Sequence, residues 1–437
     1  MKPALNELLT QVGKGTPMGG LIRRFWIPAL LSSALARDEH ATRIRLLGED
    51  LLAFRDTDGR VGVVSAICPH RGAPLYYGRN EQSGLRCVYH GWKFDIAGAC
   101  VDMPTEEADS PLAASTRLNA YHARERNGVV WVYMGDAKKI PPLPAFEWNR
   151  LAPDRCHISL RIQECNWVQA MEGSIDTAHA PMLHGRIDGH GKSVISRETV
   201  MSRVKNPKME AVDMDYGAAI ASLRQVDGLC YWRVTQFLFP FYTLIPPFED
   251  NLSGQAWVPI DDEHTLCFMF SFDPVKPLNE KIRSIYRQGY RGRESGHPSV
   301  NGLERRVGMP YEDYWPKYGR HNDFGIDWEE QRAKRFSGMP GLWVQDAAVS
   351  GLLPIVDRSC QSLGTTDTGI VRVHKRLISA AQRLRDSGEL PRGATTADVF
   401  DVRAVAMNLG PGESWKDNFE QAIRTEGEVL VAEPPEE

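Results

Sequence analysis

The sequence contains no apolar run long enough to cross a membrane. The longest, Ile27 to Ala36, includes Ser32 and Ser33 and falls short of the roughly twenty residues that a spanning helix needs. The start of the chain also lacks a signal peptide, because Asn6 and Glu7 interrupt any apolar stretch there. These absences predict a cytoplasmic protein with no membrane partner.

Blocks of like charge are missing as well. Lys and Arg are scattered among acidic residues, and the 437-residue chain has a formal net charge of -4. With 42% hydrophobic and 25% charged residues, the composition is that of an ordinary soluble globular protein. It offers no basic surface for nucleic acid, and its length predicts two or three domains.

A dinucleotide-binding motif is also absent. Gly13-x-Gly15 is followed by Met18 where the third glycine should fall, Pro17 interrupts the pattern, and no strand precedes it. Any nicotinamide cofactor must therefore be oxidised by another protein.

The eight cysteines do not indicate disulfides, because thiols stay reduced in a long cytosolic chain. Six of them are interpreted as small buried hydrophobic residues: Cys100, Cys156, Cys165, Cys230, Cys267 and Cys360.

The other two cysteines lie in Cys68-Pro69-His70 and Cys87-Val88-Tyr89-His90, two Cys/His pairs separated by sixteen residues. Two Cys with two His suit tetrahedral zinc, but zinc sites more often keep the two Cys in one pair and the two His in the other. A Rieske [2Fe-2S] cluster has two Cys on one iron and two His on the other. Because each pair here is mixed, the pattern favours the cluster.

A second candidate site lies in the stretch from Asn166 to His184. His179 and His184, with the nearby Asp176, offer material for a 2-His-1-carboxylate iron site. Residues five apart on one helix point about 140° away from each other. Pro181 disfavours helical geometry at Ala180 and can start a new helical segment, so both imidazoles can converge.

The remaining pattern predicts an α+β protein. Short strands with turns run from Arg43 to about Asp154, and Pro141, Pro142 and Pro144 mark a linker. Further antiparallel strands are expected between His157 and Phe270, then a long polar excursion from Lys276 to Gly338 and an amphipathic helix over Ile370 to Leu384. Residues after Gly388 are expected to be loop and tail.

The segments Cys68-Pro69-His70-Arg71-Gly72-Ala73 and Cys87-Val88-Tyr89-His90-Gly91-Trp92-Lys93-Phe94 resemble the Rieske motif of aromatic-ring-hydroxylating oxygenases. Gly15-Thr16-Pro17-Met18-Gly19, with Arg24, Phe25 and Trp26, resembles the N-terminal arm of the phthalate-dioxygenase-like group of this family. The resemblance implies an N-terminal arm (1–42), a β-rich Rieske domain (43–154) and a helix-grip catalytic domain (155–437), in which an antiparallel sheet carries helices. Cys68, His70, Cys87 and His90 would bind the cluster.

The same resemblance assigns roles around the second site. His179 and His184 would bind mononuclear Fe(II), and Asp176 would bridge to the cluster. The third ligand would be Asp346, in Trp343-Val344-Gln345-Asp346. Asp357 and Asp367 are competitors that are better explained as turn residues. The chain departs from the family pattern after Asp346, where the usual Glu five residues later is missing.

The resemblance further implies a terminal oxygenase that uses O2 to hydroxylate, dihydroxylate or O-demethylate an aromatic, carboxylated compound. Electrons would come from NAD(P)H through a flavin and iron-sulfur reductase, directly or through a ferredoxin. The chain would form a head-to-tail homotrimer or a dimer of trimers. Lys208, Arg224 and Arg233 are candidate partners for the substrate carboxylate.

Two other functions stay open at this point. A Rieske electron carrier would hold the cluster and no mononuclear iron. A zinc-stabilised binding module would hold neither.

Overall fold

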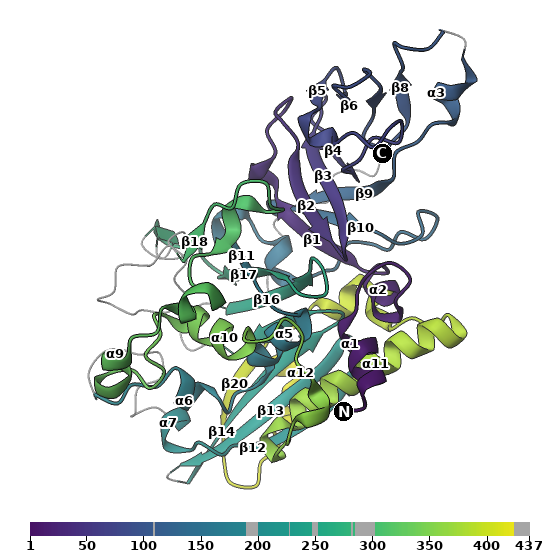
Figure 1. Ribbon diagram of the computed structural model, residues 1–437. Helices are drawn as coiled ribbons and strands as arrows, with labels where there is room; N and C mark the ends of the chain where they lie inside the picture. Colours follow the sequence, from purple (N-terminus) through teal and green to yellow (C-terminus); the bar gives the residue numbers. More distant parts are fainter. Residues whose placement is uncertain are drawn as a thin grey trace.

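The structure, a computed structural model, describes residues 1–107, 110–188, 200–226, 228–246, 252–280, 283–284 and 302–423. Its N-terminal part forms two antiparallel sheets, and the rest of the chain forms a larger antiparallel sheet with helices beside it (Figure 1). The mixed α+β class predicted from the sequence is confirmed.

The first sheet of the N-terminal part has six strands in the order β1 (Trp26–Leu31), β10 (Val129–Tyr133), β9 (Ala120–Arg126), β4 (Val61–Ser65), β3 (Glu49–Arg55) and β2 (Thr42–Leu46). The second has four short strands, β5 (Arg79–Glu81), β6 (Gly84–Arg86), β7 (Lys93–Phe94) and β8 (Cys100–Asp102).

Strand β1 corrects the prediction that the first forty residues are only a short helix and a loop. Its apolar run is buried because it pairs antiparallel with β10, from Trp26 opposite Tyr133 to Leu31 opposite Val129. The predicted arm therefore contains a strand of the neighbouring sheet. The boundaries at 42 and 154 stay predictions.

The large sheet has eight strands, in the order β11 (Cys156–Gln163), β17 (Thr265–Phe272), β16 (Leu252–Pro259), β15 (Tyr242–Ile245), β14 (Leu229–Leu238), β13 (Gly217–Val226) and β12 (Lys208–Met214), with β20 (Val405–Leu409) also paired to β14. The described α-helices are α1 (Pro3–Thr10), α2 (Pro17–Ile22), α3 (Pro111–Ser115), α4 (Glu147–Arg150), α5 (Trp167–Ile175), α6 (Ala180–Leu183), α7 (Val200–Arg203), α9 (Trp328–Ala333), α10 (Leu342–Ser350), α11 (Thr368–Ser387) and α12 (Trp415–Ala422).

Helix α11 extends along the large sheet, as the predicted amphipathic helix should (Figure 1). Its buried positions include Val373 and Leu377, four residues apart on one face. Gly369 allows the close approach, because a Cβ there would lie 2.6 Å from Cγ2 of Ile220 on β13.

The prediction that residues after Gly388 are loop and tail was wrong where β20 and α12 form. Strand β20 pairs with β14, and Trp415 and Phe419 of α12 pack with Trp232 in a separate apolar cluster. Residues 424–437, which include the predicted tail, lie outside the described residues.

The described part of the predicted polar excursion includes short regular elements. It contains β18 (Leu303–Glu304), β19 (Trp315–Pro316), α9 and the 3-10 helices η4 (Glu312–Tyr314) and η5 (Arg320–Gly325). Residues 281–282 and 285–301 of the excursion lie outside the described part of the chain.

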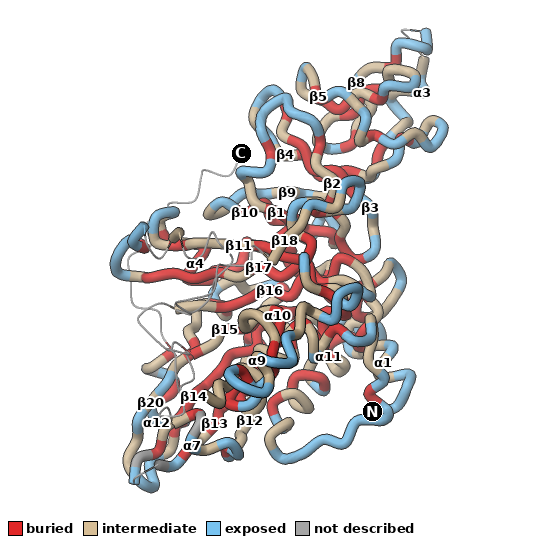
Figure 2. The backbone as a smooth tube through the Cα atoms, turned by 60° about the vertical axis from the view of Figure 1, so that its left-hand side comes forward, coloured by how far each residue is buried: buried red, intermediate tan, exposed pale blue. Residues whose placement is uncertain are grey.

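Burial is continuous from the first sheet into the large one (Figure 2). One apolar core joins them, with Trp131 of β10 stacked on Trp148 of α4 and Trp148 stacked on Phe270 of β17. A second, smaller core lies between the four-stranded sheet and strands β3 and β4, and it includes Cys68 and Cys87. In the described part of the chain, no helix combines the length and the hydropathy of a membrane span.

Candidate metal centres

The two Cys/His pairs lie on matching loops beside the four-stranded sheet. The Cys68 N–H donates to Ala73 O at 2.8 Å, and the Cys87 N–H donates to Trp92 O at the same distance. Gly72 and Gly91 have φ of +72° and +76°, so each loop turns through a left-handed residue that glycine adopts without strain. The repeated geometry fits two loops that hold one group between them.

The side chains on these loops fit an iron-sulfur cluster. Cys68 and Cys87 are each only 2% exposed, and the ring centroids of His70 and His90 are 4.5 Å apart. Nδ1 of His70 is buried and has no hydrogen-bond partner among the described residues. Desolvation, with the charges of His70 and Arg71, lowers the pKa of His90, which favours the neutral imidazole that binds metals. Two thiols beside an unpartnered imidazole nitrogen are a donor set for the Rieske cluster.

The second site is built where helix α5 ends. Asn166 caps its start by accepting from the Val168 N–H, and the helix stops at Ile175 because Asp176 is extended, with φ -89° and ψ 126°. A new one-turn helix, α6, follows with Pro181 in its first turn, and His179 and His184 flank it. The predicted new helical segment at Pro181 is confirmed, but the predicted loss of helical geometry at Ala180 was wrong. The chain leaves the helix earlier, at Asp176, and α6 places His179 and His184 at its two ends.

His179, His184 and Asp346 converge. Nε2 of His179 lies 3.2 Å from Nε2 of His184, and Oδ1 of Asp346 lies 3.5 Å and 3.3 Å from these two atoms. Donors that bind one ion at about 2.1 Å and at right angles lie about 3 Å apart, so this triangle has the dimensions of a metal site. Two imidazole lone pairs and a carboxylate repel one another unless a cation lies between them.

Two further side chains orient the imidazoles. Nδ1 of His179 donates to Oδ2 of Asp176 at 3.2 Å, and Nδ1 of His184 donates to Oε1 of Gln345 at 2.7 Å. Both rings thereby turn Nε2 toward the triangle. Burial lowers the pKa of His179, but Asp176 and Asp346 outweigh it and hold that pKa above its usual value, so the site attracts positive charge.

Gln345 was not assigned a role by the sequence. Its only signal is its place beside Asp346, and its amide is held by donation from Nε2 to Met339 O at 3.0 Å. The two competing aspartates cap turns, as expected: Asp357 accepts from the Ser359 N–H, and Asp367 accepts from the Gly364 N–H.

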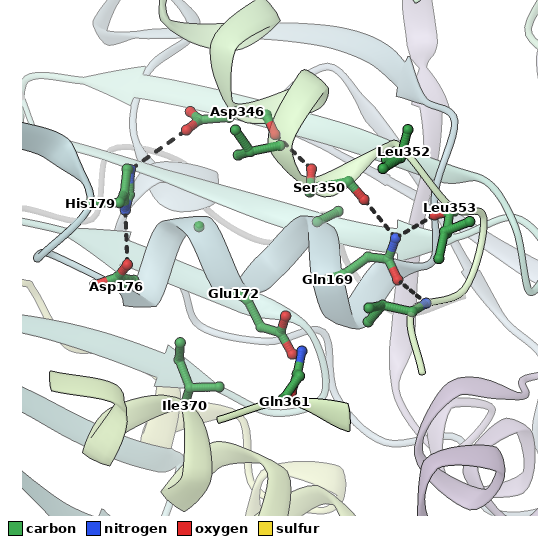
Figure 3. A pocket seen from close by; sticks show the side chains of 14 residues that line it. Gln169, Glu172, Asp176, His179, Asp346, Ser350, Leu352, Leu353, Gln361 and Ile370 are labelled. Carbon is green, nitrogen blue, oxygen red and sulfur yellow. Dashed lines mark hydrogen bonds and ion pairs between the residues drawn. The ribbon is translucent and has the colours of Figure 1, made fainter. Parts of the chain in front are cut away.

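A pocket of about 340 Å³ opens between α5 and α10 beside the triangle (Figure 3). Figure 3 shows His179 between Asp176 and Asp346 on one side of the pocket and Glu172 on the same helix as Gln169. Three carboxylates line it, and none of its described lining residues is Lys or Arg. Val349, Leu352 and Leu353 on its rim are more than half exposed.

Of the three basic residues predicted to bind substrate, the structure brings two together and separates the third. Arg224 and Arg233 are buried on neighbouring strands β13 and β14, and Nη2 of Arg224 donates to Thr177 O, within the loop between Asp176 and His179. Lys208 pairs with Leu223 in the sheet, so it lies on the opposite face from Arg224. Its side chain is 74% exposed near Glu210, apart from the two arginines, and its role in substrate binding stays a prediction.

Two family models match the chain. The Rieske [2Fe-2S] domain matches residues 25–122, and the LigXa C-terminal domain like family matches residues 132–415.

Curated relatives match nearly the whole chain. The oxygenase subunit of 3-chlorobenzoate-3,4-dioxygenase from Comamonas testosteroni is 37% identical over 96% of this chain and 98% of its own length. The phthalate 4,5-dioxygenase oxygenase subunit of Pseudomonas putida is 37% identical over 87% and 86%. The oxygenase subunit of a tert-butanol monooxygenase / tert-amyl alcohol desaturase from Aquincola tertiaricarbonis is 36% identical over 86% and 76%.

Solved structures share the fold. Dicamba monooxygenase has a TM-score of 0.58 at 18% identity and covers 84% of this chain and 99% of its own. The oxygenase of carbazole 1,9a-dioxygenase, solved with its ferredoxin, has a TM-score of 0.53 at 20% identity and covers 89% and 98%.

Proposed function

The chain belongs to the Rieske non-heme iron oxygenases, and from this we propose that it is the terminal oxygenase of a multicomponent system that oxidises an aromatic carboxylate. The convergence of His179, His184 and Asp346, in a chain that also carries the Cys/His loops, is the observation that carries the proposal. When bound, an iron at the triangle would supply O2 activation and the cluster would supply single electrons.

In this proposal the protein side chains bind the two metal centres and orient their ligands. Cys68, His70, Cys87 and His90 bind the cluster, and His179, His184 and Asp346 bind Fe(II). Asp176 keeps the proton of His179 on Nδ1, so Nε2 stays free for the metal. Its side chain is still 21% exposed, which leaves room for a hydrogen bond from outside the chain.

Metal and sulfide analysis tests the function directly. We expect about three irons and about two acid-labile sulfides per chain, one cluster plus one Fe(II). Two irons with two sulfides would identify an electron carrier, and zinc without sulfide would identify a binding module. Either result would overturn the proposal.

The electron path requires a second copy of the chain. Within one chain, the loops that carry the cluster ligands are at the far end of the molecule from α5 and α6 (Figure 1). We therefore propose a head-to-tail trimer or a dimer of trimers, in which the cluster loops of one subunit face Asp176 of the next.

Surface chemistry supports this arrangement. The cluster loops expose Val88 and Tyr89, with the Arg71 guanidinium 5.4 Å from the Tyr89 ring. The pocket beside Asp176 has an apolar rim and acidic walls. The exposed apolar side chains and the cation of the cluster loops are therefore complementary to the apolar rim and the carboxylates of the pocket.

The proposal also requires an electron donor. The chain has no dinucleotide-binding motif, so NAD(P)H is oxidised by a separate flavin and iron-sulfur reductase, directly or through a ferredoxin. A cytoplasmic location, where thiols stay reduced, is consistent with electron supply from NAD(P)H.

We propose that Arg224 and Arg233 face the negative group of the substrate. Burial, together with the charge of Arg233, lowers the pKa of Arg224 to about 10. Two guanidinium groups that raise each other's free energy inside the protein would be stabilised by a bound carboxylate. Tert-butanol, the substrate in the name of one relative, has neither an aromatic ring nor a carboxylate, so the arginines, rather than family membership, support an anionic substrate here.

Arg224→Gln is expected to raise KM for a benzoate roughly tenfold to a hundredfold, because a hydrogen bond to a charged group contributes about 1.5–3 kcal/mol. Turnover of the matching benzamide should change little. Lys208→Gln is the control, since that side chain lies on the other face of the sheet. Equal losses for the benzoate and the benzamide would show that Arg224 only supports the fold.

A further inference from the structure

The partly buried carboxylate of Glu172, whose side chain is 17% exposed, joins segments that are far apart in the sequence. Its Oε1 accepts from Nε and Nη2 of Arg358 at 3.0 and 2.8 Å and from Nε2 of His374 at 2.7 Å. Arg358 and His374 are 1% and 3% exposed. Arg358 also donates from Nη1 to Oδ1 of Asn6 at 3.0 Å, so helices α1, α5 and α11 meet at this cluster.

The charge on Glu172 is retained despite burial. Burial raises the pKa of Glu172, but His374 and Arg358 lower this pKa by more than burial raises it, so the net shift is downward. Buried ion pairs contribute little net stability compared with apolar side chains of the same volume. We therefore interpret these ion pairs as contacts that fix the relative positions of the helices, rather than as contacts that add much stability.

These relative positions matter for α5, which leads into the segment of His179 and His184, and for α10, which carries Asp346. Glu172 lies on α5 one turn before Asp176, the residue that caps the end of this helix, and the Glu172 carbonyl accepts the Asp176 N–H at 3.0 Å. Arg358 lies in the segment that follows α10, the helix of Asp346.

Gln169, one turn earlier on α5, holds the same segment. Its Nε2 donates to Ser350 O and Leu353 O at 2.6 and 2.8 Å, and its Oε1 accepts from the Val356 N–H at 2.9 Å (Figure 3). Helix α5 is thus tied at two successive turns to the chain that leaves α10.

We propose that Glu172 is a positioning residue for the metal site, an inference that rests on the proposed function. Its ion pairs with Arg358 and His374 lock the last turn of α5 against the segment after α10. This keeps the Asp346 carboxylate within reach of His179 and His184 before any metal binds. Glu172 makes its side-chain hydrogen bonds with Arg358 and His374, and not with the metal-binding His179 or His184. Its effect on the metal site therefore acts through the placement of the helices.

The test is metal affinity, measured without turnover. Full-length Glu172→Gln protein, with the cluster intact and mononuclear metal removed by chelation, is titrated with Co(II) and followed by the visible absorption of the bound ion. Glutamine keeps the shape and removes the charge. We expect the affinity to fall about tenfold or more, as for other residues that support metal ligands, with the cluster spectrum unchanged.

Glu147→Gln is the matched control. Glu147 is a buried carboxylate and pairs with Arg403, but it belongs to α4 and does not line the pocket. Its substitution should lower the melting temperature comparably and leave Co(II) affinity unchanged. Equal affinity losses in both variants would overturn the proposal, as would unchanged affinity in Glu172→Gln.

His374→Gln covers the case in which Glu172→Gln does not fold. It removes one of the two partners and leaves Arg358 in place, so a smaller loss of affinity is expected, and no loss would overturn the proposal. If the unsubstituted protein binds Co(II) but oxidises no aromatic compound, the proposed function fails. The Co(II) affinities of the variants still decide whether Glu172 positions the metal site.

Discussion

Asp346→Ala is expected to abolish turnover and to remove the mononuclear iron while the absorption spectrum of the cluster stays unchanged. Asp346 supplies the carboxylate oxygen of the triangle, 3.3 and 3.5 Å from the two imidazole nitrogens. Its loss leaves two neutral donors. Substitutions that only disturb the support of a metal ligand cost about tenfold to a hundredfold, so loss of the ligand itself should cost at least about a hundredfold.

The cluster should survive because its ligands lie beside a different sheet, at the second, smaller core. Asp357→Ala is the control, because Asp357 caps a 3-10 turn (η6, Arg358–Cys360) and lies outside the triangle. His179→Ala and His184→Ala should behave like Asp346→Ala. If Asp346→Ala kept its iron and activity and Asp357→Ala lost both, the third ligand would be Asp357 and not Asp346.

Asp176→Asn is expected to keep both metals and the oligomer but to lose turnover by about a hundredfold. The amide is nearly the same size, so the fold should tolerate it. However, asparagine lacks the charge that holds the proton of His179 and that would accept a hydrogen bond from His90 of the next subunit. The measurement is single-turnover oxidation of the reduced cluster with substrate and O2 present. Near-normal oxidation would show that Asp176 is not the bridge.

Mixed oligomers separate the bridge from a general defect. Subunits with Cys87→Ser, which lose the cluster, and subunits with Asp346→Ala, which lose the iron, should each be inactive alone. Co-assembled, they should recover partial activity, because a head-to-tail ring places an intact cluster beside an intact iron at some interfaces. If electrons pass within one chain, the mixture stays inactive.

Local sequence was sufficient for the family and for much of the secondary structure. Mixed Cys/His pairs predicted a Rieske domain, and the match to that domain over residues 25–122 confirms it. Pro181 predicted the start of a new helical segment between the two histidines, because proline is tolerated in the first turn of a helix, although the chain leaves the preceding helix earlier, at Asp176. The periodicity of Ile370 to Leu384 likewise predicted α11 from local sequence.

What tertiary structure decided depends on pairing between distant segments. The last strand, β20, forms because β14 offers it a partner, which no pattern after Gly388 reveals. Lys208 and Arg224 look equivalent in sequence, yet the register of β12 with β13 places them on opposite faces of the sheet. Glu172 meets Arg358 only because α5 packs against the chain that leaves α10. Sequence by itself determined which donor atoms are present; only folding decided which side chains share a site, since register and packing join residues as far apart as Glu172 and Arg358.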